Sequence, residues 1–276
     1  MKELTSDEVK EVELELVILF DELCSKNNWR YSLGGGSLLG AIRHKGFIPW
    51  DDDIDVIMPR PDYDRFILYS KENSLPFLFM TYETTAGYNN LQGKIVANNT
   101  IIKDSMIDTE KYQMGIHIDV FPIEGMGNTK EEAIKVFNKT TFRRELLNAR
   151  TWKRYSRSKT HPFYYEPIRF VFFILSRFVN AESLLKSIDR ENRKRKFDEM
   201  KFVGCVGGCY RKKEILPYQV LASFVRMEFE GRYLCCLKYY DEYLGSIYGK
   251  YMTLPPDNQR ISHHTFKAYL LEKEDK

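Results

Sequence analysis

The sequence predicts an α+β protein in which a strand-rich first half carries the polar motifs and a helix-rich second half packs on it. Short apolar or alternating stretches bounded by Gly and Pro recur through residues 1–128. From about residue 129 to about residue 200 the apolar spacing is helical instead. We expect residues 1–128 to form the core domain. Because no repeat or low-complexity linker separates the halves, residues 129–276, a helix-rich basic region and C-terminal segment, are expected to pack on that core.

Length and composition indicate a folded, nearly neutral protein with an uneven charge distribution. A chain of 276 residues, 14% of them aromatic, can bury a sizeable core. Its net charge is +3, yet residues 141–213 hold 19 Lys and Arg against 7 Asp and Glu, a net of +12. The chain has no uncharged apolar stretch of ~18 residues, and its acidic N-terminus does not resemble a signal peptide. The expected location is therefore the cytoplasm, and no nucleic-acid partner is expected.

The five cysteines favour reduced thiols over a disulfide framework. Cys205, Cys209, Cys235 and Cys236 could in principle supply four zinc ligands. Their spacing is not a typical zinc pattern, and an adjacent pair has difficulty presenting both thiolates to one tetrahedral ion. Ordinary buried thiols are the better expectation.

The elements of the first half can be expected in order along the chain. A capping box at Thr5 and Glu8 precedes an opening helix whose apolar residues recur at steps of three and four, namely Val9, Val12, Leu16, Leu19 and Leu23. Next come a strand at 29–33, a glycine turn at 34–36, a short helix at 37–44, an acidic run and strand at 51–58, and a helix at 63–71. Further strands are expected at 77–82, 93–97, 100–102 and 116–120. A last helix at about 237–249 precedes an irregular tail that begins at Pro255.

The glycine run Gly34-Gly35-Gly36-Ser37 lies between a predicted strand and a predicted helix. Glycines at such a point let backbone N–H groups approach a phosphate, and the N-terminus of the helix favours an anion. A glycine triplet is more often only a turn, so this motif alone does not establish a site.

The acidic run at 51–55 predicts a metal site. On an extended strand Asp53 and Asp55 point to one face, with Asp51 just before them and the intervening apolar residues toward the core. Carboxylates this close repel one another unless a cation compensates their charge. Mg²⁺, or Mn²⁺, suits such a set because it binds one or two carboxylates together with the oxygens of a substrate phosphate. The alternative is a solvated acidic turn.

Asp119 is a third candidate carboxylate, on a second predicted strand. The alternation of Ile116–Val120 places His117 and Asp119 on the same face of that strand. An acid here would complete a clamp with the acidic run. Without the glycine run and the acidic run, Asp119 would be interpreted as an acid at the edge of a sheet.

The stretch from Tyr31 to Met58, which reads YSLGGGSLLGAIRHKGFIPWDDDIDVIM, closely resembles the LicD family, whose distant animal relatives are fukutin and fukutin-related protein. Further similarity lies in the segment that begins HIDVFPI at His117, the aromatic helix that ends at Tyr248, and the tail from Pro255 to His264. Departures are few: Gly34 makes the glycine run one residue longer than the usual pair, and Lys250 stands where members often carry an acid.

The resemblance implies a polymerase-β-like nucleotidyltransferase fold, with residues 1–128 as its catalytic core and a mixed sheet that carries the active site. It implies that Gly35, Gly36 and Ser37 hold the donor phosphate and that Asp53, Asp55 and Asp119 hold the metal. Asp51 or Asp119 would accept the proton of the acceptor hydroxyl. Three further candidates for phosphate contacts are Arg43, His44 and Lys94.

The implied reaction moves phosphocholine from CDP-choline to a hydroxyl of a glycan precursor, such as teichoic acid or lipopolysaccharide, and releases CMP. The acceptor is expected to be a glycan, with a lipid-linked precursor as one form of it. One alternative is transfer from a CDP-polyol, or nucleotidyl transfer from ATP or CTP, on the same fold. Another is an inactive module that binds glycan or choline. Aromatic faces would hold the quaternary ammonium, but the sequence does not identify which ones.

The segment Phe163–Phe178 permits two interpretations. It is rich in Phe, Tyr and Ile, is interrupted by Arg169, and lies inside the basic region beside Lys153, Arg154 and Arg157. One interpretation is a core helix of the second lobe. The other is an interfacial helix that binds anionic lipid at the inner face of the membrane.

Overall fold

The computed structural model describes residues 1–276 except 52, 104–113, 158–161, 261–265 and 272–276. Seven of the described strands form a mixed sheet in the order β2-β3-β7-β5-β4, with β8 paired to β7 and β9 paired to β8. These strands are β2 (Ser32–Leu33), β3 (Asp55–Pro59), β4 (Leu78–Met80), β5 (Gly93–Val96), β7 (His117–Gly127), β8 (Phe202–Cys205) and β9 (Ile215–Pro217). The sheet is mixed because β3 and β7 run parallel while the other pairs are antiparallel.

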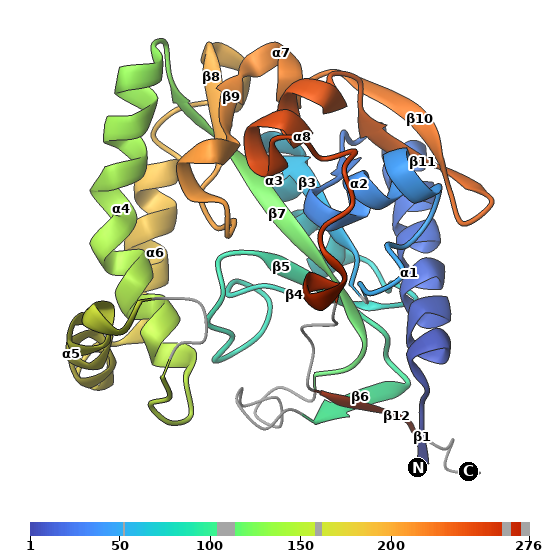
Figure 1. Cartoon of the computed structure of the whole chain (residues 1–276), viewed down its shortest axis with the longest axis horizontal. Helices are drawn as coiled ribbons and strands as arrows, with labels where there is room; N and C mark the ends of the chain where they lie inside the picture. Colours follow the sequence, from blue (N-terminus) through green and yellow to red (C-terminus); the bar gives the residue numbers. More distant parts are fainter. Residues whose placement is uncertain (52, 104–113, 158–161, 261–265, 272–276) are drawn as a thin grey trace.

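The remaining strands form a hairpin and a small sheet. The hairpin joins β10 (Phe224–Phe229) to β11 (Arg232–Leu237). The small sheet has the order β1-β12-β6, with β1 at Lys2–Glu3, β6 at Thr100–Lys103 and β12 at Lys267–Leu270. It brings the two ends of the described chain side by side (Figure 1).

Helices cover the sheet on several sides (Figure 1). The α-helices are α1 (Ser6–Asn27), α2 (Gly35–His44), α3 (Arg60–Glu72), α4 (Lys130–Thr151), α5 (Glu166–Arg177), α6 (Ala181–Asn192), α7 (Tyr218–Leu221) and α8 (Tyr240–Tyr248). Short 3-10 turns are η2 (Phe163–Tyr165), η3 (Phe197–Glu199), η4 (Arg211–Glu214) and η5 (Asp257–Gln259). No helix among the described residues has both the length and the apolar character that a membrane span requires.

Strand β7 organises the sheet. Its first part lies between β3 and β5, and its last part pairs with β8, so its eleven residues meet three other strands. Residues of the core pack around it from both halves of the chain: Phe20 and Phe66 precede it, and Phe229 and Leu244 follow it. The boundary expected at 128/129 falls between β7 and α4, and β8 and β9 from beyond it join the same sheet.

Most expected elements of the first half are present. The Thr5 side chain accepts from the Glu8 backbone N–H and the Glu8 side chain accepts from the Thr5 N–H, so the capping box of α1 is confirmed. The expected strands at 77–82, 93–97 and 100–102 correspond to β4, β5 and β6. The strand expected at 116–120 continues to Gly127 because β8 supplies it with a partner. Strands β8 to β11 were not expected from the sequence.

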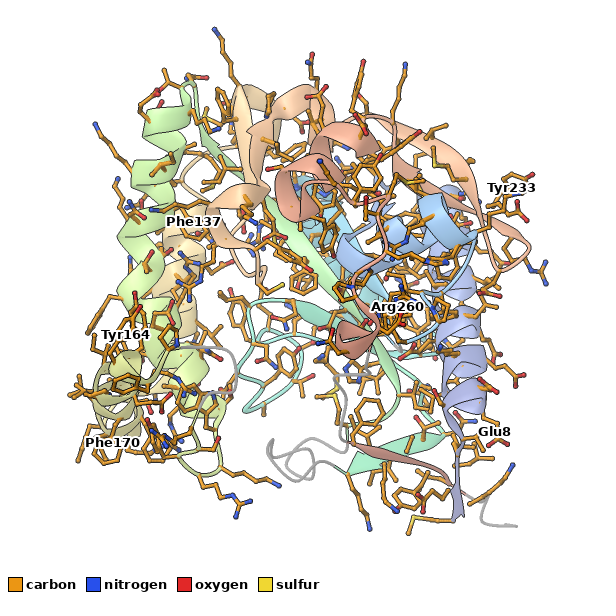
Figure 2. All side chains as sticks on the ribbon, viewed as in Figure 1. Glu8, Phe137, Tyr164, Phe170, Tyr233 and Arg260 are labelled. Carbon is orange, nitrogen blue, oxygen red and sulfur yellow. The ribbon has the colours of Figure 1, made fainter. Side chains whose placement is uncertain are left out.

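Helix α5 contradicts the interpretation of residues 163–178 as a core helix. Within α5 only Ser176 is buried. Its large apolar side chains are exposed instead, among them Ile168, Phe170, Val171 and Ile174. In Figure 2, Phe170 and the neighbouring Tyr164 lie at the outer edge of the molecule. The apolar composition of this segment therefore does not reflect burial.

A buried ionic network joins the two halves of the chain. Arg60, at the start of α3, donates through Nε to Glu124 Oε2 at 3.0 Å, and its Nη2 contacts the other carboxylate oxygen. Asn192 of α6 donates to the same carboxylate at 3.4 Å. Glu124, on β7, is 1% exposed. A buried carboxylate is tolerated only when its charge is compensated in this way.

We expect Glu124→Leu to lower the free energy of unfolding by about 3–5 kcal/mol, because it leaves the Arg60 guanidinium buried without its main partner. Urea denaturation followed by circular dichroism measures the change. The matched control is Glu182→Leu, which removes an exposed pair with Lys186 on α6 and should cost less than about 1 kcal/mol. Equal effects of the two substitutions would contradict this account of the buried network.

Candidate active site

Three candidate site residues lie side by side across the sheet. In the parallel pairing of β3 with β7, Asp55 is the register partner of Asp119. On the other side of β7, Asp119 is the register partner of Lys94 on β5. Register partners on neighbouring strands project from the same face of a sheet. The pairing therefore brings together residues that are far apart in the sequence, and Lys94 Nζ forms an ion pair with Asp119 Oδ1.

The electrostatics of Asp55 show that the other three candidate acids act on its carboxyl group. Burial raises the pKa of the Asp55 carboxyl well above its usual range, and the negative charges of Asp53 and Asp119 raise it further. The Lys94 ammonium opposes this rise, while Asp51 adds a smaller contribution in the same direction as the other acids. The acidic run and β7 thus create one shared negative region.

The glycine run lies directly against these carboxylates. Gly35 has a φ of +46°, a left-handed conformation that side chains disfavour. A Cβ atom on Gly36 would lie 2.6 Å from Asp51 Oδ2, which is closer than a normal contact. Ser37 Oγ accepts from the Asp55 backbone N–H at 2.8 Å. The N-terminus of α2 is therefore packed onto the acidic run, and the three residues predicted to hold phosphate border the acids.

Arg43 and His44 lie at the other end of α2, roughly 12 Å along the helix from Gly35. Arg43 donates through Nε to His44 Nε2 at 2.9 Å and through Nη1 to the Tyr251 carbonyl at 2.8 Å. Burial, and then the charge of Arg43, lower the pKa of His44. The structure thus separates these two residues from the glycine run, whereas it places Lys94 with the acids.

Three tyrosines adjoin the site and were not selected from the sequence. The Gly35 N–H donates to the Tyr243 hydroxyl at 3.2 Å, so α8 contacts the glycine run. A Cβ on Gly35 would lie 3.9 Å from the Tyr248 hydroxyl. Tyr210 donates to Tyr248 at 2.8 Å, and their rings meet edge to face. The aromatic helix that ends at Tyr248 was visible in the sequence, but its position beside Gly35 was not.

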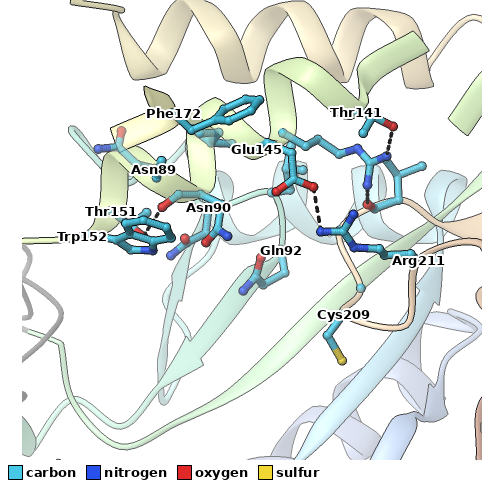
Figure 3. Close-up of a pocket in the computed structure, with 18 of the residues that line it drawn as sticks. Asn89, Asn90, Gln92, Thr141, Glu145, Thr151, Trp152, Phe172, Cys209 and Arg211 are labelled. Carbon is cyan, nitrogen blue, oxygen red and sulfur yellow. Dashed lines mark hydrogen bonds and ion pairs between the residues drawn. The ribbon is translucent and has the colours of Figure 1, made fainter. Parts of the chain in front are cut away.

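A cavity of about 1080 Å³ lies between the helical side of the molecule and the sheet (Figure 3). Trp152 and Asn89 lie toward one end of it, with Cys209 and Arg211 toward the other. Phe121 also lines the cavity and follows Asp119 by two residues on β7, hence on the same face. Burial, Glu214 and the charge of Asp55 together raise the pKa of Cys209 to about 11. The cavity therefore lies beside the acidic region, although the candidate acids are not among its lining residues.

The donor set fits a divalent cation in its chemistry. Asp55 and Asp119 lie on neighbouring strands, and the burial of mutually repelling carboxylates is a cost that a bound cation would offset. Among the described residues no three His, Cys, Asp or Glu side chains converge closely enough to hold an ion as they stand. Lys94 forms an ion pair with Asp119 in this conformation. Binding of a metal by Asp53, Asp55 and Asp119 therefore stays a prediction.

The cysteines that a zinc site would need are distributed over β8, the loop that follows it, and β11. Cys235 and Cys236 are consecutive residues of β11, so their side chains point to opposite faces of the hairpin. Cys205 is buried at the end of β8, and burial raises the pKa of its thiol. Cys24, Cys205 and Cys236 are buried free thiols.

Comparison with known proteins identifies the family of this chain. The family model described as "LicD/FKTN/FKRP, nucleotidyltransferase domain" matches residues 28–172. This range includes the glycine run, the acidic run and Asp119. It also contains the first part of α5, up to Phe172, but none of the three tyrosines described above.

Individual relatives extend the similarity over the rest of the chain. A Haemophilus influenzae protein named lipopolysaccharide cholinephosphotransferase LicD is 33% identical over 275 residues, which is 98% of this chain and 100% of that protein. An uncharacterized protein of Rickettsia typhi is 49% identical over 45 residues, 16% of this chain and 15% of its own. Another of Rickettsia prowazekii is 57% identical over 35 residues, 13% of each chain. The chain belongs to the LicD family.

Proposed function

We propose that this protein transfers phosphocholine from CDP-choline to a hydroxyl of a cell-surface glycan precursor and releases CMP. The observation that carries the proposal is the Asp55–Asp119 register pair with the glycine run of α2 packed against it. The name of the full-length Haemophilus relative supports phosphocholine as the transferred group. Its name also favours lipopolysaccharide over teichoic acid as the class of acceptor. The description of the family supports a fold of the nucleotidyltransferase type.

The glycine run would hold the donor. Backbone N–H groups at the start of α2 and the Ser37 hydroxyl border the acids, and a helix N-terminus stabilises an anion. Asp53, Asp55 and Asp119 would hold Mg²⁺ or Mn²⁺. Such an ion, when bound, neutralises charge on the donor phosphates and on the departing CMP. Lys94, which pairs with Asp119, would contact the same phosphates.

The acceptor would lose its proton to one of the acids. The hydroxyl oxygen attacks the phosphorus that carries choline, and the bond from that phosphorus to the CMP oxygen breaks. Asp51 or Asp119 takes the hydroxyl proton. The large cavity that reaches Phe121 and Cys209 would admit the glycan from the side of Asp119. Its amide and aromatic lining, which includes Asn89, Asn148 and Trp152, suits a sugar.

Tyr210 and Tyr248 would bind the choline group. Their ring centroids are 5.2 Å apart and the rings meet edge to face, and the charge of Asp55 acts on Tyr210. Aromatic faces attract a quaternary ammonium. The position of this pair beside Gly35 is compatible with a phosphate on the glycine run and choline a few bonds away.

The metal assignment can be tested by stability as well as by turnover. Because the pKa of Asp55 is raised, the unfolded carboxyl ionises at lower pH than the folded one. This group therefore costs stability increasingly as pH rises above ~4. Relative to Asp55→Asn, the metal-free wild type should gain thermal stability when pH falls from neutral toward ~5. At neutral pH, Mg²⁺ should raise the melting temperature of the wild type and not of Asp55→Asn.

Turnover should be lost in Asp53→Ala, Asp55→Ala and Asp119→Ala while circular dichroism shows an intact fold, since each substitution removes a proposed metal ligand. The matched control is Asp241→Ala, an acid that bonds to Tyr251 at the surface and should retain wild-type turnover. Full activity of Asp55→Ala, or of the wild type in excess chelator, would exclude the metal mechanism.

The donor is tested by product release. With Mg²⁺ and lipopolysaccharide as acceptor, CDP-choline should yield CMP and choline-bearing glycan, measured by chromatography and mass spectrometry. Turnover with CDP-ribitol or CDP-glycerol and none with CDP-choline would replace this proposal by polyol phosphate transfer. Pyrophosphate release from ATP or CTP would indicate nucleotidyl transfer instead.

The choline site is tested at Tyr248. Tyr248→Leu should raise the KM for CDP-choline about 2- to 30-fold, the range expected for loss of one cation–π contact. Tyr248→Phe keeps the ring and should stay within about twofold of the wild type. An equal rise in both variants would assign the effect to the lost hydrogen bond with Tyr210.

A further inference from the structure

Helix α5 is oriented with its charges inward and its apolar residues outward. The ionic side chains of α5 face the protein: Arg169 pairs with Glu166 at 2.7 Å and lies over the Trp152 ring, and Arg177 donates to the Trp152 carbonyl at 2.7 Å. The opposite face carries only apolar residues. With the adjacent turn and cap, this apolar face consists of Phe163, Tyr164, Ile168, Phe170, Val171, Ile174, Leu175 and Phe178.

The side chains of this face are highly exposed to solvent for apolar residues. Val171 is 53% exposed, Phe163 is 76% exposed, and Phe178 at the C-terminal cap is 84% exposed. Water-facing helices normally show the reverse arrangement, with apolar residues against the core. Contiguous exposed apolar surface of this extent marks a binding surface.

Basic side chains border the apolar face. Residues 152–157, which connect α4 toward α5, pack on the helix through Tyr155, whose ring lies 5.2 Å from that of Phe170. Lys153, Arg154 and Arg157 of the same segment are exposed. They belong to the region 141–213, whose net charge is +12. An apolar face with cations at its margin matches the headgroup boundary of an anionic bilayer.

We propose that the apolar face of α5 docks on an anionic phospholipid surface, with the basic segment 152–157 against the headgroups. A bilayer is favoured over a second copy of the chain because the cations at the margin would repel their copies across a symmetric interface.

Docking of this kind does not depend on the proposed function. If that function holds, docking also has a use, because Tyr165, Ile168 and Phe172 line the cavity. A lipid-linked acceptor would then reach the cavity from the membrane surface.

Co-sedimentation with vesicles tests the proposal. The full chain should pellet with phosphatidylcholine vesicles that contain about one third phosphatidylglycerol, and not with phosphatidylcholine alone. Binding should fall as salt rises to about 0.5 M. The variant K153E/R154E/R157E should lower the partition coefficient at least about tenfold. The variant V171S/I174S should lower it comparably, because it removes apolar contact area.

Matched control variants change residues away from α5. The variant K26E/R232E/K238E changes the net charge equally on α1, on β11 and just after β11, across the molecule from α5 (Figure 1). The variant L68S/M252S removes exposed apolar residues elsewhere. Both controls should bind like the wild type. Equal loss in the control and test variants would overturn a localised docking face. Recovery of the wild-type protein in the supernatant with anionic vesicles at low salt would also overturn the proposal. A concentration-dependent dimer that V171S/I174S dissociates, without vesicle binding, would assign the face to a second copy.

Discussion

The parallel pairing of β3 with β7 is the constraint on which the site depends. It sets Asp55 directly opposite Asp119, and the antiparallel β5 then places Lys94 on the far side of Asp119. The same β3 supplies Ile57, against which the glycine run packs, so α2 begins at the acids. Because β7 also pairs with β8, the loop that carries Cys209 and Tyr210 is brought to the same region. The register of β3 with β7 thus brings the acids, the glycine run, the Lys94 ammonium group and aromatic rings into one region.

Local patterns in the sequence predicted those parts of the fold that local interactions determine. The Thr5–Glu8 capping box and the alternation around Asp119 are decided within a few residues, and both are present. The hairpin β10–β11 was missed although a signal existed. Its turn is Glu230-Gly231, and both residues have positive φ, as a tight hairpin requires. Strand β8 gives a weaker signal in the sequence, because it is only four residues long and includes Gly204. One of the two strands it pairs with, β7, lies far away in the sequence.

The acids and glycines of the candidate site could be selected from the sequence, whereas the residues that surround them could not. The acidic run and Asp119 were expected to meet, and the sheet does bring them together. Tyr243 reaches Gly35 across 208 positions of the chain, a contact that no spacing rule indicates. The orientation of α5 is equally a tertiary property. Its composition was compatible with burial or exposure. The contacts of Arg169 and Arg177 with Trp152 hold the charged face of α5 against the protein and leave the apolar face to solvent.

The central claim is that Asp55 and Asp119 hold a divalent cation beside a diphosphate bound at the start of α2. A crystal structure of the protein with CDP-choline and Mn²⁺, measured for anomalous scattering of manganese, tests it most directly. The account predicts a manganese peak in contact with both carboxylates and the diphosphate against the backbone of Gly35 and Gly36. A nucleotide bound elsewhere, or a manganese peak that touches neither Asp55 nor Asp119, would contradict it.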